Sequence, residues 1–376
     1  MAPGDRVRWK TRMPLAVKST ATVLCVVGAV LASCATPDPN APRRFMKRPG
    51  HRMGGLPFPG AFTLYKAADP ENLGDHRYTT ALRFALPDRE QYRGIVYTCH
   101  AGFLDLAHIR KAVDWTKHFS VLIELALMEG SESIALQGEE PSLFHLTIHY
   151  PDDWSTLADD ERDALIRELS IRMGQRVSYL LSTWHEIITW FGYKTTIIIP
   201  EHSSAFTYDD IVSHLVGLQV ADAALRDPDR DYDAAVTHAL DAALKRLGMV
   251  SKKQAAEAID KVKGLWWEWD GSKKRYLDIG MEGESIDPWL VRGLSFCTDG
   301  EGESFTVPTL NTVMDRDFSR FCDVQIEPRI MESNRIRSEL EPRPERIRPK
   351  DHFPQLMERI HAQMAKVLGP DVSQPY

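Results

Sequence analysis

Apolar and polar residues follow the periods of strands and helices along the first half of the chain. Residues 93–99 are a β-branched and aromatic run that predicts a strand. Residues 133–137 predict a second strand, and residues 143–150 predict a third because apolar and polar side chains alternate there. Residues 103–128 and 157–191 carry apolar side chains three and four positions apart, which predicts two long helices.

The rest of the chain predicts further helices, followed by a region of short strands. Residues 194–199 indicate a buried strand, and helices are expected from Thr207 to about residue 262. From Trp266 onward, short aromatic runs separated by Gly and Pro favour strands. The expected fold class is α+β. Its expected parts are a first lobe with helices and a small mixed sheet at 63–265, a β-rich second lobe at 266–334, and a charged linker with a closing C-terminal helix at 335–376.

Residues 1–33 have the pattern of a secretory signal. Basic side chains precede an apolar run over 21–32, which is shorter than the roughly 20 residues that span a bilayer. The run ends at Leu31-Ala32-Ser33-Cys34, which resembles the lipobox of bacterial lipoproteins. The resemblance implies lipidation of Cys34, and Ala35 in place of Asp implies the outer membrane, facing the periplasm. The alternative is an ordinary signal peptide in which Cys34 has no special role.

An extended tether and an acidic body are expected after the signal. Residues 34–62 are rich in Pro and Gly, which favours a tether between the lipid and the folded part. The net charge of −7 becomes −11 without residues 1–33, which carry five basic side chains and one acidic one. An acidic body argues against general nucleic-acid binding. The expected partner is the membrane, through the lipid anchor, together with an unidentified protein or cell-envelope partner.

Three cysteines remain after the signal segment and the lipidated position, so at least one has no partner within the chain. Cys297 and Cys322 are the expected disulfide because they are close in sequence, although spacing alone does not establish the pair. Cys99 would then be free. It lies between a predicted strand and a predicted helix, whose N-terminal field lowers the pKa of a thiol. A catalytic Cys99 is therefore one hypothesis. Residues 99–103 distantly resemble the helix start of the cell-wall amidases related to papain, and this resemblance implies a histidine on a following strand, His145 or His149, as the base.

Histidine and acidic side chains gather near element ends between residues 99 and 214. They pair by helical spacing or by adjacency: Asp105 with His108, His185 with Glu186, and Asp210 with His214. Such pairs can hold a divalent metal such as zinc, and the three histidines are the candidate metal ligands. Asp105, His108, His185 and Glu186 are the candidate catalytic residues. Thr189 stands where the metalloprotease helix requires its second His, so the ligands must come from several elements.

Three stretches, 97–110, 184–192 and 204–210, resemble a family of bacterial exported proteins known as a domain of unknown function. The resemblance extends over roughly residues 97 to 330. It implies a bacterial lipoprotein or secreted protein, and it implies no activity and no site residue.

Two hypotheses for function remain open. The first, slightly favoured, is a non-catalytic envelope scaffold or binding lipoprotein, because the sequence has a tether, an acidic body and no complete catalytic motif. The second is a hydrolase that acts on envelope material through a metal or through Cys99. Convergence of the histidine and acidic side chains named above would favour the hydrolase, and their dispersal would favour the scaffold.

Overall fold

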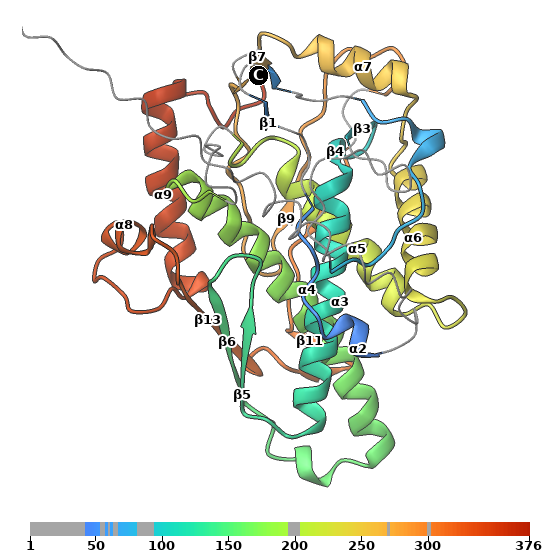
Figure 1. The fold of residues 1–376 in the computed structure, drawn as a ribbon, viewed down its shortest axis with the longest axis vertical. Helices are drawn as coiled ribbons and strands as arrows, with labels where there is room; N and C mark the ends of the chain where they lie inside the picture. The colour runs from blue at the N-terminus through green and yellow to red at the C-terminus, as the bar shows by residue number, and fades with distance from the viewer. Residues whose placement is uncertain are drawn as a thin grey trace, which may run out of the picture. The chain divides into compact units, whose positions relative to one another are not determined.

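Three long helices form the centre of the fold. They are α3 (Leu106–Met128), α4 (Asp159–Trp190) and α5 (Asp210–Leu225), and α3 contacts both of the others (Figure 1). The computed structural model describes residues 42–52, 57–58, 61–62, 67–80, 94–194, 204–268, 271–298 and 302–376. The helix predicted over 157–191 is confirmed within two residues at either end, because its long apolar stripe packs into the core.

The central helix α3 approaches its two neighbours at glycines. A Cβ on Gly217 of α5 would lie 2.6 Å from the carbonyl oxygen of Ile109 in α3. A Cβ on Gly174 of α4 would lie 2.2 Å from Oγ of Ser120 in α3. Both distances are shorter than any real contact, so a larger residue would push the helices apart. The close packing of the three helices therefore depends on two positions without a side chain.

A three-stranded antiparallel sheet packs beside the helices. It contains β5 (Ser133–Gln137), β6 (Leu143–Ile148) and β13 (Cys322–Glu327), with β6 in the middle. Phe144, Leu146 and Ile148 of β6 are buried, as the alternating sequence predicts. The α+β fold class is confirmed, but this sheet is antiparallel and not mixed. Because β13 comes from residues 266–334, the two parts of the chain share one sheet.

A short hairpin leads into α3. It consists of β3 (Ile95–Thr98) and β4 (Gly102–Asp105), which pair antiparallel. The helix expected from residue 103 therefore begins three residues later, because the chain first returns along β3. Asp105 ends β4 and caps α3, where its Oδ1 accepts a hydrogen bond from the N–H of Ala107 at 2.7 Å.

The remaining elements surround this centre. The helices are α2 (Pro42–Phe45), α6 (Tyr232–Arg246), α7 (Lys252–Lys261), α8 (Ser333–Ser338) and α9 (Pro349–Leu368), with short 3-10 turns at Pro70–Asn72 and Trp154–Thr156. Two-residue strands form antiparallel pairs: β1 (Pro57–Phe58) with β2 (Ala61–Phe62), β7 (Trp267–Glu268) with β8 (Gly271–Ser272), β9 (Ser285–Ile286) with β10 (Phe305–Thr306), and β11 (Thr312–Val313) with β12 (Arg316–Asp317).

Residues 42–52 belong to the folded body, so the tether expected over 34–62 is wrong for this stretch. Phe45 of α2 is buried, and its ring centroid lies 5.0 Å from that of Tyr78 and 5.2 Å from that of Tyr232. Arg52 forms a buried ion pair with Asp114 of α3 at 2.7 Å. One aromatic and one charged side chain thus fix a segment whose Pro and Gly content alone predicts a tether.

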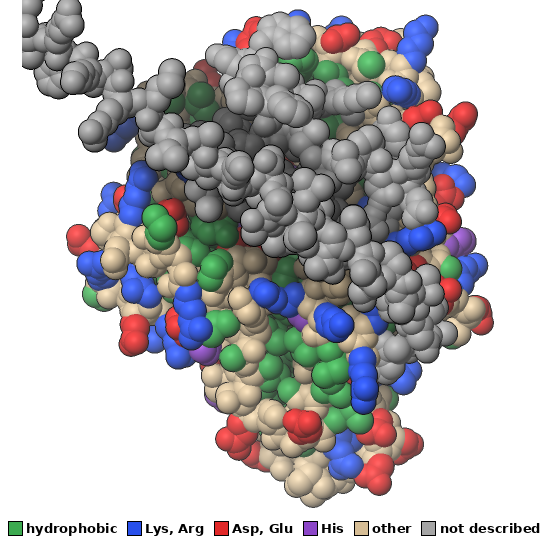
Figure 2. Space-filling model, viewed as in Figure 1, with side chains coloured by type: hydrophobic (Ala, Val, Ile, Leu, Met, Phe, Trp, Pro, Cys, Tyr) green, Lys and Arg blue, Asp and Glu red, His purple; other side chains and the backbone are tan. Residues whose placement is uncertain are grey.

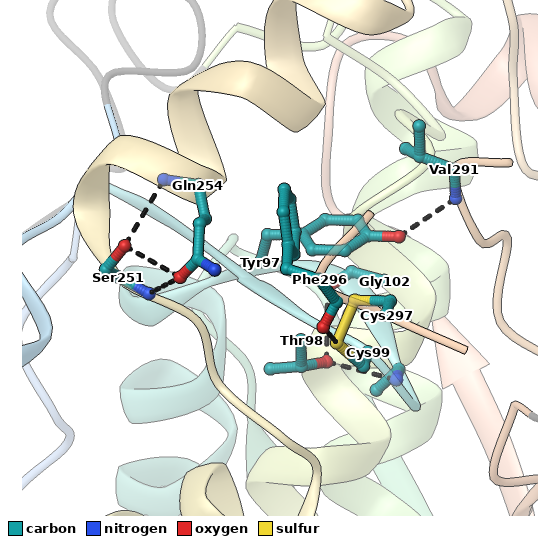
Figure 3. Close-up of a disulfide and its surroundings, with 10 residues drawn as sticks. Tyr97, Thr98, Cys99, Gly102, Ser251, Gln254, Val291, Phe296 and Cys297 are labelled. Atoms are coloured by element: carbon teal, nitrogen blue, oxygen red, sulfur yellow. Dashed lines mark hydrogen bonds between the residues drawn. A yellow bond between two sulfur atoms is a disulfide. The ribbon is translucent and has the colours of Figure 1, made fainter. Parts of the chain in front are cut away.

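The disulfide joins Cys99 to Cys297, with Cα atoms 5.4 Å apart (Figure 3). The expected Cys297–Cys322 pair is therefore wrong, and Cys322 is a free, buried thiol. The reason is tertiary. Cys322 begins β13 in the three-stranded sheet. The segment before Cys297 lies instead against the β3–β4 hairpin, where the N–H of Val291 donates to Oη of Tyr97 at 3.0 Å.

The described surface carries charges of both signs. Figure 2 shows Lys and Arg side chains among Asp and Glu side chains over the visible face. Within the described ranges, none of the helices combines the length and the apolar character that crossing a bilayer requires. The signal segment at 1–33, Cys34 and residues 195–199 of the strand predicted over 194–199 lie outside the described residues.

Candidate functional site

Ends of α3, α4 and α5 bring several acidic and histidine side chains together. We call this group the helix-end cluster, and its members are Asp105, His108, Glu186, Asp209, Asp210 and His214. Asp105 and His108 lie at the start of α3, Asp209 precedes α5 and Glu186 lies in the last turns of α4. The cluster is therefore assembled by helix packing.

His108 lies between two carboxylates. Its Nδ1 is 3.1 Å from Oδ1 of Asp210 and 3.6 Å from Oδ2 of Asp105, and its side chain is 22% exposed. Burial acts to lower the pKa of His108, but the negative charges of Asp105 and Asp210 outweigh burial and raise the pKa to about 10. The imidazole of His108 consequently carries a proton at neutral pH when no metal is bound.

Asp209 completes a set of three metal-ligand atoms. One ligand atom from each of Asp105, His108 and Asp209 lies within 4.8 Å of the other two. Oδ1 of Asp209 is buried and has no hydrogen-bond partner within the described part of the chain. Burial, followed by the charges of Asp210 and Asp105, raises the pKa of Asp209 well above its usual value. This carboxylate is thus desolvated without compensation from a hydrogen-bond donor at Oδ1.

Glu186 and His214 border this set of three. Oε2 of Glu186 accepts a hydrogen bond from the N–H of Phe206 at 2.8 Å. Burial and the charge of Asp210 raise the pKa of Glu186 to about 7. The ring centroid of His214 lies 5.0 Å from that of His108, and Nδ1 of His214 is buried without a partner among the described residues. Burial and the positive His108 lower the pKa of His214 well below its usual value.

A second polar group lies where the turn between β5 and β6 meets the helices. We call it the hairpin-tip cluster, and its members are His51, Lys111, Glu139, Glu140 and His185. Glu139 forms ion pairs with His51 and with Lys111 of α3. Oε1 of Glu140 lies 2.5 Å from Nδ1 of His185, and ligand atoms of Glu139, Glu140 and His185 lie within 4.8 Å of one another.

A comparison with protein-family models finds a match, and the matched residues include both clusters. The model of a family described as "Protein of unknown function (DUF4056)" matches residues 45–277, which is more than half of the chain. The chain belongs to the DUF4056 family. The matched range contains every residue of the helix-end and hairpin-tip clusters. No curated protein and no solved structure matches the chain.

The structure brings the six predicted metal-site residues into two neighbouring groups within the DUF4056 region. Asp105, His108, Glu186, Asp210 and His214 share the helix-end cluster, whereas His185 lies in the hairpin-tip cluster. Sequence reasoning missed Asp209, although it adjoins Asp210. It also missed Lys111, which lies one helical turn after His108, and it missed His51, Glu139 and Glu140, for which no helical spacing gives a signal.

Cys99 is not available as a nucleophile, because its sulfur is bonded to Cys297. The hypothesis also fails on position, since β4 separates Cys99 from the start of α3. The two proposed bases lie on β6 and contact other acids. Nε2 of His145 is 2.8 Å from Oε2 of Glu327, and His149 similarly contacts Asp323.

A cavity of about 450 Å³ lies beside the disulfide. Tyr97, Trp289, Arg292 and Tyr376 line it together with both bonded cysteines. The ring of Trp289 packs against that of Trp266, with centroids 5.6 Å apart, so the indole also serves the core. The described lining includes no member of either polar cluster, so the cavity is separate from them.

Proposed function

We propose that this chain is an exported, metal-dependent hydrolase that holds a divalent cation such as Zn²⁺ with Asp105, His108 and Asp209. The observation that carries the proposal is the convergence of three ligand atoms within 4.8 Å, drawn from two helix ends. The buried, unpartnered Nδ1 of His214 and Oδ1 of Asp209 border the same place among the described residues. Buried polar atoms usually have partners, and a cation supplies one for Asp209.

The charge of the helix-end cluster favours a cation. Four carboxylates belong to the cluster: Asp105, Glu186, Asp209 and Asp210. The proton on His108 compensates part of their negative charge in the metal-free protein, and burial together with the charge of Asp210 raises the pKa of Glu186 and of Asp209. A divalent ion would replace that proton and neutralise more of the buried negative charge, which is the usual exchange when a metal binds histidine.

Three protein ligands leave a coordination position for water, as in catalytic zinc sites. A bound metal lowers the pKa of such a water to about 7, which provides hydroxide at neutral pH. Glu186 is the proton acceptor we assign, because the N–H of Phe206 holds one of its oxygens at 2.8 Å. The partial exposure of His108 would give solvent a route to a metal held there.

Metal analysis and hydrolysis assays test the proposal together. Purified protein should contain or take up Zn²⁺, and it should cleave at least one ester, amide or phosphoester bond of envelope material. Asp209→Asn should abolish cleavage, whereas His145→Gln, in a histidine–glutamate pair on the sheet, should leave it unchanged. Protein that binds no metal would overturn the proposal and return the non-catalytic scaffold as the better interpretation.

We propose further that Cys34 anchors the protein in the cell envelope, at the outer membrane and facing the periplasm. The sequence Leu31-Ala32-Ser33-Cys34 after an apolar run supports this, and so does the disulfide, since disulfides persist in oxidising compartments. Cys34→Ala should release the protein from membranes or leave an uncleaved precursor. Unchanged mature size and unchanged membrane fractionation would refute the anchor.

A further inference from the structure

We propose that the hairpin-tip cluster is a second divalent-cation site, with Glu139, Glu140 and His185 as its ligands. One ligand atom from each of these residues lies within 4.8 Å of the others. The site goes beyond the proposed hydrolase and does not rest on it, because none of its three ligands belongs to the helix-end cluster. Glutamate oxygens with one imidazole nitrogen suit Mn²⁺, Fe²⁺ and Zn²⁺.

Glu140 provides an independent observation that favours a cation at this site. Its side chain is only 1% exposed, and Oε1 faces His185 at 2.5 Å. Oε2 is buried and has no hydrogen-bond partner in the part of the chain that the structure describes. An unpaired buried carboxylate oxygen is costly, and a cation among Glu139, Glu140 and His185 would give it a partner.

The charges at the hairpin tip leave room for a cation beside Lys111. The buried ammonium of Lys111 contacts Glu139 and also interacts electrostatically with Glu140 and Glu186. One lysine therefore faces three buried carboxylates. A divalent ion held by Glu139, Glu140 and His185 would add positive charge to this group of carboxylates.

The surroundings of the tip fix the ligands before a cation arrives. Glu139 and Glu140 lie on the short turn between β5 and β6, whose strands pair from Ser133 opposite Thr147 to Gln137 opposite Leu143. His51 and Lys111 hold Glu139 from two sides, and helix α4 positions His185. Such second-layer contacts keep metal ligands in place, so the site is preorganised.

The two sites are close enough in the charge network to influence each other. Lys111 lies one helical turn after His108 on α3 and interacts with Glu186, and His214 is affected by both His108 and His185. Two divalent ions repel each other across a buried region of low dielectric constant. We therefore expect the second equivalent of metal to bind more weakly than the first.

Equilibrium dialysis against Mn²⁺ tests the second site, after a chelator has removed any bound metal from the protein. The unmodified protein should bind two equivalents, and Glu140→Gln should lose one of them while keeping the other. Glu327→Gln is the matched control, because Glu327 also pairs with a histidine, His145, but lies on the sheet. This variant should still bind two equivalents of Mn²⁺. Circular dichroism checks the fold of Glu140→Gln, and His185→Asn provides a second variant with the same expected loss.

The outcomes separate this proposal from the hydrolase. One equivalent in the unmodified protein, lost in Asp209→Asn and kept in Glu140→Gln, overturns the second site and leaves the first intact. One equivalent lost only in Glu140→Gln supports the second site and removes the metal from the proposed hydrolase. Two equivalents that survive both Glu140→Gln and His185→Asn overturn the ligand assignment. No bound Mn²⁺ overturns the second site, and the Zn²⁺ analysis of the purified protein then decides the first.

Discussion

Removing the Cys99–Cys297 disulfide should cost the protein a large part of its stability. The bond joins positions 198 residues apart. In the loop-entropy model, a cross-link across such a loop stabilises the fold by about 5 kcal/mol, because it restricts the unfolded chain. Typical domains have a total free energy of unfolding of about 5–15 kcal/mol. The double variant Cys99→Ala/Cys297→Ala should therefore be marginally folded at 37 °C.

Guanidinium unfolding of the oxidised protein and of the double variant measures this difference. Cys322→Ala is the control, because Cys322 is a free thiol outside the bond and its removal should cost much less. Two-state transitions by circular dichroism and fluorescence are needed for the comparison. A loss below about 1 kcal/mol in the double variant would refute the reasoning, since loop closure would then contribute little to the stability.

Three further predictions concern metal, pH and packing. EDTA should lower the melting temperature, and Zn²⁺ at 100 times its dissociation constant should restore about 2.7 kcal/mol, as calorimetry would show. Burial lowers the pKa of His214 in the folded protein. Below about pH 6.5 the imidazole of His214 is therefore protonated in the unfolded chain but not in the folded one. The free energy of unfolding then falls as the pH falls, by up to about 1.4 kcal/mol per pH unit. After a chelator has removed bound metal, the free energy of unfolding of His214→Asn should consequently fall less between pH 7.5 and 5.5 than that of the unmodified protein. An equal fall in both proteins would refute this. Gly217→Ala should destabilise by about 1–3 kcal/mol in urea, because its Cβ would meet α3, and a neutral effect would contradict the packing argument.

Long helices and regular strands were predictable from the sequence because many residues repeat the same spacing of apolar side chains. The strand predicted at 133–137 has the observed bounds of β5, and the helix predicted at 157–191 became α4 with small changes at its ends. The short strand β4 was not predictable in this way. Its four residues continue the apolar pattern of the helix that follows, and only the pairing with β3 identifies them as a strand.

Helical spacing also explains how much of the polar site could be predicted. Asp105 with His108, and Asp210 with His214, are close because helix geometry makes them neighbours. Glu139 and Glu140 lie on a turn, and only the packing of the sheet against the helices brings them to His185. The disulfide shows the same limit, since Cys297 bonds a cysteine 198 residues away and not its nearer neighbour in sequence.

The direction of the helices at the helix-end cluster affects how tightly the proposed metal would be held. Helix α3 begins immediately after Asp105, and α5 begins at Asp210, so two helix N-termini face the cluster. Each N-terminus carries a partial positive charge that favours a nearby carboxylate by about 0.3–1 kcal/mol and disfavours a cation similarly. The two N-termini would thus offset part of the cost of the buried carboxylates in the metal-free protein and would weaken metal binding by a similar energy, so the site would need a higher metal concentration for the same occupancy.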